Sequence, residues 1–280
     1  MKKKIFVRGP VLSQSGYGEQ SRFALRALRS QENIFDIYVQ PLPWGKTGWI
    51  WEDNEFRQWL DSRIAITQVL IQQGQMAPDF SLQITIPNEF QKIAPINIGY
   101  TAGIETTKVA PKWLQHGNEM DKILVVSEHA KTTYENTVVQ ATMPNGQTVP
   151  YRLESPIEVV SESTLRHTPE EIDQLNLEFD NNMLMISQFS ARKNFVNALQ
   201  WWVEEFKNDE IGLVVKTNVA SNSIMDREYT ENMLKNILSS HPDRKCKVYL
   251  LHGDLSPGQM VGLYANPKFK ALVNIAHGEG

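Results

Sequence analysis

Charged and polar side chains end or directly follow four apolar runs in the second half of the chain. In chain order they are Arg192 and Lys193, Lys216, His252 and Asp254, and His277 and Glu279. Apolar runs of this length are typical of buried strands. Because ligands of open parallel sheets bind beyond the carboxyl ends of the strands, four such loops predict one polar cleft along a single sheet edge.

Arg192 and Lys193 occupy an unusual position. They fall in the first turn of a helix predicted over 191–206. That turn carries unpaired N–H groups and partial positive charge, so a cation there costs a few tenths of a kcal/mol, roughly. A bound phosphate would make the two cations favourable there, because it would accept hydrogen bonds from the N–H groups and from both side chains. The alternative is that both side chains face solvent and Ser190 caps the helix.

The loop "GPVLSQSGYGEQ" near the start of the chain is a second candidate phosphate site. It follows a predicted strand, opens a predicted helix and contains Gly16 and Gly18. It departs from the dinucleotide-binding pattern, because Ser21 stands where the third glycine would be. The next predicted strand also ends in Gln40 rather than in an acid, which disfavours an NAD-dependent enzyme.

Other chemistries have little support in the sequence. The six histidines lack the paired spacing of metal ligands, and neither a G-x-S-x-G elbow nor a Walker loop occurs. We therefore expect no metal and no bound cofactor. His129, in "VVSEHAK", is either an ordinary residue after a strand or a catalytic base.

Aromatic residues gather in two places. The first group lies within 41–60 and consists of Trp44, Trp49, Trp51 and Trp59. It forms either local core packing or a platform that stacks a sugar or another flat ligand. The second group is the apolar face of the helix predicted over 191–206, which we expect in the core: Phe195, Leu199, Trp202 and Phe206.

The first half alternates strand and helix. A strand, a glycine loop, a helix and a second strand fill the first 40 residues, and a helix is predicted from Pro111. Further strands are predicted at 63–71, 81–87, 96–103, 122–128 and 157–160. The turn-rich stretch 143–156 predicts a hairpin or an excursion around Asn145 and Gly146. This alternation predicts a parallel sheet with crossover helices.

The second half repeats the pattern. Four apolar runs are separated by helices predicted over 191–206, about 226–239, and 257–265, the last with Ser256 as N-cap and Pro257 at its first position. The polar stretch 161–173 is the candidate linker. The sequence therefore predicts two doubly wound α/β domains, 1–164 and 165–280.

Composition limits the class of protein. The chain has 280 residues, and at roughly 150 residues per domain this suggests two domains. A formal net charge of -4 disfavours a general nucleic-acid binder. Cys246 is the only cysteine, and no apolar segment reaches the length of a membrane span. We therefore expect a cytoplasmic protein in a reducing compartment.

Five segments together resemble the retaining GT-B glycosyltransferases of the family 4 type. They are the glycine loop, "VVSEHAK", "ISQFSARKN", "LHGDLSPGQMVGLYA" and "NIAHGEG". The likeness spans nearly the whole chain, and "ARKN" and "HGEG" are its most specific parts. It implies the GT-B architecture, in which two Rossmann-like domains of parallel sheet face each other across a cleft.

The resemblance also implies roles for single residues. Arg192 and Lys193 would hold the donor diphosphate, with Gly16 approaching the same phosphates. Lys216 is a further donor-binding candidate, and Leu255 would be an apolar contact beside the base. The catalytic candidates that we carry forward are Glu279, which would orient the donor sugar, Glu105 at the inner edge of the first domain, and His129.

The implied activity is metal-independent transfer of a hexose-like sugar from a nucleotide diphosphate sugar, such as a UDP- or GDP-sugar, with retention. The acceptor is a saccharide, a lipid or a protein. The alternatives are a nucleotide-sugar binding module without turnover and a GT-B-like epimerase or phosphorylase. The family's second glutamate would lie beyond Gly280. From this ending we expect an incomplete second domain that either self-associates through its open sheet or is only marginally stable.

Overall fold

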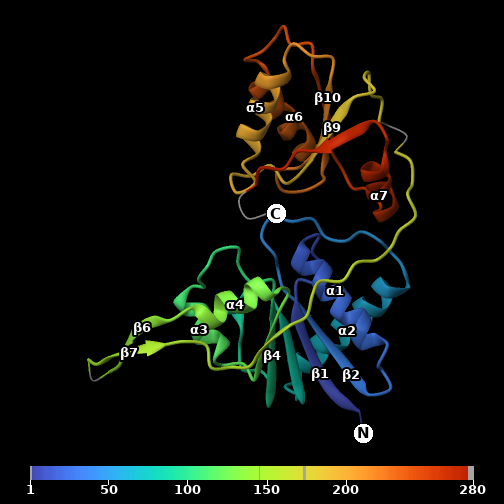
Figure 1. Cartoon of the computed structure of the whole chain (residues 1–280). Helices are drawn as coiled ribbons and strands as arrows, with labels where there is room; N and C mark the ends of the chain where they lie inside the picture. Colours follow the sequence, from blue (N-terminus) through green and yellow to red (C-terminus); the bar gives the residue numbers. More distant parts are fainter. Residues whose placement is uncertain (1, 145, 173–174, 277–280) are drawn as a thin grey trace. The chain divides into compact units, whose positions relative to one another are not determined.

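The computed structural model describes residues 2–144, 146–172 and 175–276. The chain divides into two compact units, Met1–Thr164 and Leu165–Gly280 (Figure 1). Each unit contains its own parallel sheet with helices packed against it. None of the helices in the described residues is both long and apolar enough to cross a bilayer.

The first unit contains a sheet of six parallel strands. They are β1 (Lys3–Gly9), β2 (Phe35–Pro41), β3 (Phe80–Ile84), β4 (Ile96–Thr101), β5 (Lys122–Val125) and β8 (Ile157–Val159), arranged in the order β2-β1-β3-β4-β5-β8. In the register, Val7 of β1 lies beside Val39 of β2 and Leu82 of β3. The direction of chain progression reverses between β1 and β3, which makes this position the topological switch point of the sheet.

The helices of the first unit pack on two apolar clusters. Helices α1 (Gly16–Arg29) and α2 (Glu55–Gln72) contribute to a cluster that contains Leu25, Leu60 and strand residues of β1 and β2. Helices α3 (Pro111–Gly117) and α4 (Glu128–Asn136) contribute to a second cluster around Ile123 of β5. A single 3-10 turn, η1 (Pro87–Glu89), follows β3.

The strand predicted over 63–71 is wrong, because these residues belong to α2. The side chain of Asn54 caps this helix by accepting a hydrogen bond from the N–H of Arg57. Leu60, Ile64 and Thr67 are buried at a spacing of four and three residues, which is the period of a helix face. Helical periodicity over 18 residues thus outweighs the strand preference of the β-branched residues within it.

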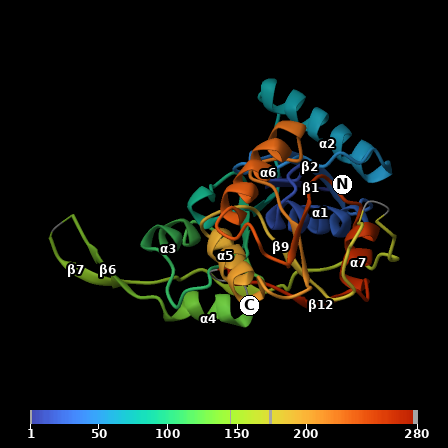
Figure 2. The same cartoon turned by 90° about the horizontal axis from the view of Figure 1, so that it is seen from above.

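The predicted hairpin is confirmed. Strands β6 (Val139–Thr142) and β7 (Thr148–Tyr151) pair antiparallel, and Figures 1 and 2 both show them extending away from the sheet of the first unit. Gly146 adopts a φ of 83°, a conformation that glycine reaches without strain. Asn145, the other residue of the predicted turn, lies outside the described residues.

The second unit contains a sheet of four parallel strands. They are β9 (Asn182–Ile186), β10 (Gly212–Lys216), β11 (Lys247–Leu251) and β12 (Phe269–Leu272), in the order β11-β10-β9-β12. Leu213 and Val215 join a core cluster with α5 (Phe195–Phe206) and α6 (Ile224–Leu238), whereas Val214 joins a cluster with α7 (Pro257–Ala265). Alternate residues of β10 therefore pack against helices on opposite faces of the sheet. Helices on both faces define the doubly wound α/β class, which confirms the prediction.

The helix predicted over 191–206 begins later than expected, at Phe195. Its N-cap is Asn194, which has left-handed backbone angles (φ 51°, ψ 31°), and the N–H of Asn194 donates to the carbonyl of Ala191 at 2.9 Å. Asparagine tolerates this conformation better than most residues. Arg192 and Lys193 therefore lie in a turn before the helix, and Ser190 is not its cap. The predicted apolar face is confirmed as core.

Two glycines at the start of α1 have different structural roles. A Cβ added at Gly18 would lie 2.1 Å from the backbone oxygen of Ser13, whereas one added at Gly16 would have no neighbour within 4 Å. We predict that Gly18→Ala lowers the free energy of unfolding by about 1–3 kcal/mol, because backbone atoms would have to move. Gly16→Ala should leave it within about 1 kcal/mol. Urea unfolding measures both, and equal effects would contradict this assignment.

Candidate functional site

The turn that carries Arg192 and Lys193 lies at the topological switch point of the second sheet. It follows β9, and the order of the strands reverses between β9 and β12. The loop is held in place, because the N–H groups of Ser187 and Phe189 donate to the carbonyls of Lys216 and Asn218 at 3.2 and 2.8 Å. This is where open α/β sheets bind ligands.

Lys216 ends the neighbouring strand β10 and connects it to the loop after β11. Its Nζ donates to the carbonyl of Gly253 at 2.7 Å. Burial lowers the pKa of the Lys216 ammonium, and the nearby Asp254 carboxylate partly opposes this shift. One of the three donors of the ammonium thus fixes the loop. This geometry makes Lys216 a residue that shapes the edge, and its contact with a ligand remains a prediction.

Asp226, on α6, organises the same edge and was missed by the sequence reasoning. Its carboxylate accepts hydrogen bonds from the N–H groups of three loop residues at 2.7–3.0 Å, and His252 Nε2 lies 2.9 Å from Oδ1. The three residues are Val219, Ala220 and Ser221. Burial alone would raise the pKa of Asp226, but these hydrogen bonds lower it to about 2. The spacing Ser223-x-x-Asp226, a capping-box pattern, was the available signal.

His252 is placed differently from the sequence expectation. Its side chain is 2% exposed and is held against Asp226, so it supports the loops instead of lining a polar cleft. Asp254 accepts a hydrogen bond from Asn222 of the loop after β10. Leu255 is partly buried and packs on the cluster that includes Leu263 of α7. The loops after β10 and β11 are therefore joined by side-chain contacts.

A small pocket of about 80 Å³ lies at the carboxyl edge of the first sheet. Its lining comes from the start of α1, the ends of β3 and β4, and the segments after β5 and β8: Gly16, Tyr17, Gln20, Ile84, Tyr100, Thr101, Ala102, Val126 and Glu162. Tyr17 is hydrogen bonded to the Oγ1 of Thr101 at 2.8 Å, and Gln20 donates to the Tyr100 hydroxyl at 2.6 Å. Apart from Gly16, none of these residues was predicted.

Ionisation of the two pocket tyrosines is disfavoured. Burial is the main reason that the pKa of Tyr17 and the pKa of Tyr100 are raised, and the Glu162 carboxylate adds to both shifts. The Tyr100 hydroxyl donates to the carbonyl of Val160 at 2.6 Å. Both phenols are therefore neutral at physiological pH and act as hydrogen-bonding groups of the pocket wall.

The remaining predicted residues fall in different places. Gly16 opens α1, whose N-cap Ser15 accepts from the N–H of Gly18, and the space beside Gly16 is open. Glu105 is exposed in the loop after β4, and His129 is exposed in the first turn of α4. His277 and Glu279 lie outside the described residues.

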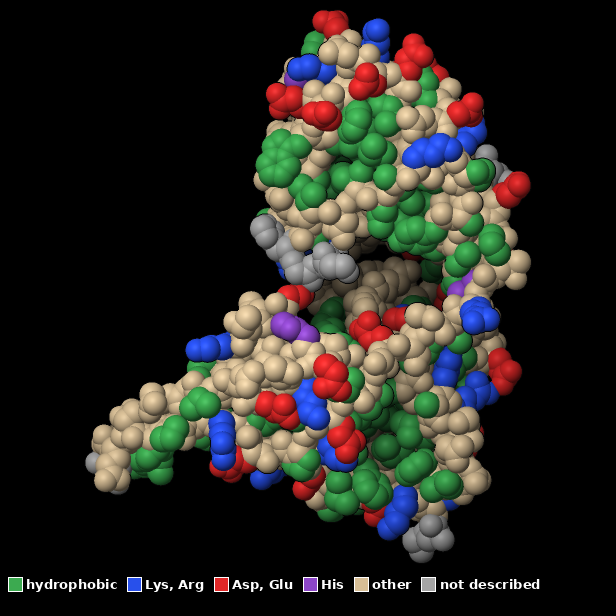
Figure 3. Space-filling view, viewed as in Figure 1, with side chains coloured by type: hydrophobic (Ala, Val, Ile, Leu, Met, Phe, Trp, Pro, Cys, Tyr) green, Lys and Arg blue, Asp and Glu red, His purple; other side chains and the backbone are tan. Residues whose placement is uncertain are grey.

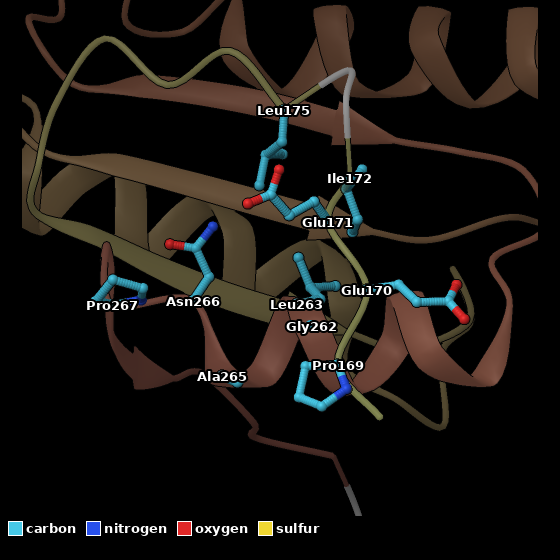
Figure 4. A pocket seen from close by; sticks show the side chains of 10 residues that line it. All are labelled: Pro169, Glu170, Glu171, Ile172, Leu175, Gly262, Leu263, Ala265, Asn266 and Pro267. Carbon is cyan, nitrogen blue, oxygen red and sulfur yellow. The ribbon is translucent and has the colours of Figure 1, made fainter. Parts of the chain in front are cut away.

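A larger hollow of about 440 Å³ in the second unit is lined by residues 169–172, by Leu175 and by α7 (Figure 4). Glu170 is held at this helix, because its carboxylate accepts from the Ser256 hydroxyl at 2.6 Å. The hollow is also lined by Asn266 and Pro267, which directly precede β12. It therefore lies toward the amino ends of the strands, away from the edge that binds ligands in such sheets.

Two other binding classes receive no support from the described residues. Among residues 2–144, 146–172 and 175–276, no three His, Cys, Asp or Glu side chains are grouped to hold a metal. On the face shown in Figure 3, Lys and Arg side chains are interspersed with Asp and Glu. Such a mixed face does not form the broad basic surface that nucleic acids require.

Comparison with known proteins identifies the fold. No protein-family model and no curated protein matches the sequence. Among solved structures, the apo structure of OtsA aligns with a TM-score of 0.53 and 11% identity, over 100% of this chain and 80% of that chain. The structure described as "Trehalose-6-phosphate from E. coli bound with UDP-2-fluoro glucose" aligns with a TM-score of 0.52 and 11% identity, over 99% and 80%. The chain therefore has the GT-B fold of glycosyltransferases.

The low pKa of Asp226 predicts a pH-dependent contribution to stability. The ordinary value is 3.8 and the folded value is about 2, so the contribution is complete above about pH 5 and is lost as the pH falls toward 2. We expect Asp226→Asn to lower the free energy of unfolding by roughly 2 kcal/mol at neutral pH, and by progressively less below about pH 4.

Urea unfolding of the variant and the unchanged protein between about pH 7 and pH 3 measures this difference. Asp180→Asn is the control, because the Asp180 side chain is 94% exposed. A difference between Asp226→Asn and the unchanged protein that stays constant over this range would show that the Asp226 hydrogen bonds do not favour its charged form.

Proposed function

We propose that the chain is a glycosyltransferase that moves a hexose-like sugar from a nucleotide diphosphate sugar to an acceptor, with retention and without a metal. The observation that carries this proposal is the position of two adjacent cations, Arg192 and Lys193, in the turn at the switch point of the second sheet. The GT-B fold supports it, and the relative described with UDP-2-fluoro glucose has the same fold.

Transfer requires stabilisation of the leaving group. The bond between the anomeric carbon and the diphosphate oxygen breaks, and the electron pair leaves with the diphosphate. The acceptor oxygen then bonds to the same carbon on the same face and loses its proton. A guanidinium and an ammonium placed before α5 would neutralise the growing charge on the diphosphate, which is the usual way that fixed charges accelerate such steps.

The proposal also assigns roles in donor binding and catalysis to the other predicted residues. Gly16 leaves open space at the start of α1, where a phosphate could accept hydrogen bonds from backbone N–H groups. Glu279 would orient the sugar, Leu255 would contact the base, and Glu105 and His129 would act from the first unit. A reducing compartment is part of the same proposal, since Cys246 is buried and unpaired.

We predict that Arg192→Ala and Lys193→Ala each weaken the binding of a UDP- or GDP-sugar by about tenfold or more, because charge-assisted bonds to phosphate are lost. Calorimetry on the whole chain measures this change. Lys247→Ala is the matched control, because Lys247 begins β11 at the opposite, amino end of the same sheet and pairs with Glu178. Equal affinities for all variants would contradict the proposed diphosphate site.

A transfer assay with the bound nucleotide-sugar separates the enzyme from its alternative. The proposal expects a nucleoside diphosphate product that forms more slowly in the Arg192 and Lys193 variants. Tight donor binding with no product, in the presence of a range of acceptors, would instead identify a nucleotide-sugar binding module.

A further inference from the structure

Two tryptophans of the first unit are exposed although their backbone is firmly held. Trp49 is 68% exposed and Trp51 is 59% exposed. Both belong to residues 42–54, which we call the tryptophan loop. The interpretation of the tryptophans in 41–60 as local core packing is therefore wrong for these two, because large apolar side chains that serve a core are removed from water. Trp59, in contrast, packs on the core cluster of α1 and α2.

The tryptophan loop is hydrogen bonded on both sides. Its residue Trp49 forms an antiparallel bridge with Ser13 of the glycine loop. The N–H of Ile50 donates to the carbonyl of Leu12 at 2.9 Å, and Arg57 of α2 donates to the carbonyl of Ile50 at 2.7 Å. Ile50, which separates the two tryptophans, thus has both backbone groups paired. The rings are presented by a backbone that is already ordered, which lowers the entropy cost of binding.

Exposure alternates along this segment. Trp49 and Trp51 are exposed, whereas Ile50 between them is only partly exposed. In an extended chain, side chains two residues apart project to the same face. The exposure of both indole side chains fits this extended pattern, in which the two residues are spaced by about 7 Å along the backbone.

Another tryptophan of the same loop packs beside the pocket of the first sheet. The ring of Trp44, in the same loop, lies with its centroid 4.6 Å from that of Tyr17. Tyr17 in turn lines the pocket at the carboxyl edge. The tryptophan loop therefore contributes one ring, that of Trp44, next to a residue of the pocket wall. The hydroxyl groups of Ser13, in the glycine loop, and Thr47, in the tryptophan loop, are hydrogen bonded to each other at 2.8 Å.

Charge decides which flat ligand suits the tryptophan loop. Residues 42–54 contain two acids, Glu52 and Asp53, against one base, Lys46, so their formal charge is 1 − 2 = −1. That balance repels the phosphates of nucleic acids and the headgroups of anionic membranes. A neutral saccharide fits better, because the C–H face of a sugar ring stacks on indole and its hydroxyls bond to carboxylates and hydroxyl side chains.

We infer that Trp49 and Trp51 form a stacking subsite for a neutral saccharide acceptor of at least two sugar units. The inference rests on the proposed function and deepens it, since it selects a saccharide among the possible acceptors. The sugar unit that accepts the transfer would lie toward the Tyr17 pocket. The following units would stack on Trp49 and Trp51.

The test is binding of the whole chain to an array of neutral oligosaccharides, followed by calorimetry with the best oligomer and with its monosaccharide. We expect the oligomer to bind more tightly than the monosaccharide. We also expect Trp49→Ala and Trp51→Ala each to weaken binding of the oligomer by about tenfold. Trp201→Ala is the matched control, because Trp201 on α5 of the second unit is also 59% exposed. It should leave the affinity unchanged.

Three results would overturn the inference. They are no binding to any oligosaccharide of the array, an equal loss in Trp201→Ala, and tryptophan-dependent binding to phosphatidylcholine vesicles in place of saccharides. These measurements need no donor. Saccharide binding that depends on Trp49 and Trp51 would thus stand even if UDP- and GDP-sugars failed to bind, and donor binding without saccharide binding would overturn the subsite alone.

Discussion

The parallel arrangement of the strands is the constraint on which the rest of this structure depends. In both sheets every strand runs in the same direction, so all carboxyl ends meet at one edge of each sheet. The crossover helices then begin beside that edge and direct their free N–H groups toward it. In each sheet, the loop at the switch point carries an unusual sequence, the glycine loop after β1 and the cationic turn after β9.

Buried polar contacts turn these loops into ordered structure. Asp226 binds three backbone N–H groups and His252, and Lys216 binds the carbonyl of Gly253. In the first unit, the hydrogen bonds of Tyr17 and Tyr100 join α1 to the end of β4. Such contacts make a buried polar group favourable instead of costly. The edges are therefore held in shape before any ligand binds.

The sequence predicts the elements whose signals are local and strong. The N-cap Ser256 with Pro257 at the first position of α7, the hairpin around Gly146 and the apolar face from Phe195 to Phe206 all appear as expected. Prediction fails where two local signals compete. The β-branched residues at 64–71 favour a strand, but the 18-residue helical period prevails. Likewise Asn194 adopts a left-handed conformation that starts α5 later than the pattern indicates.

The candidate site is predicted only in part, for a related reason. Cations after a strand are visible in the sequence, so Arg192, Lys193 and Lys216 could be named. The contact of Asp226 with His252 and that of Tyr17 with Thr101 join residues that are 26 and 84 positions apart in the chain. Such pairs depend on the order of the strands, which periodicity alone does not give. The exposure of Trp49 and Trp51 depends on the same long-range pairing with the glycine loop.

The most direct test of the central claim is a crystal structure of the chain with a bound UDP- or GDP-sugar. The account predicts that diphosphate oxygens lie within about 3 Å of the side-chain nitrogens of Arg192 and Lys193, at the carboxyl edge of the second sheet. A nucleotide bound instead in the hollow between residues 169–172 and α7, or at the carboxyl edge without contact to either cation, would contradict it.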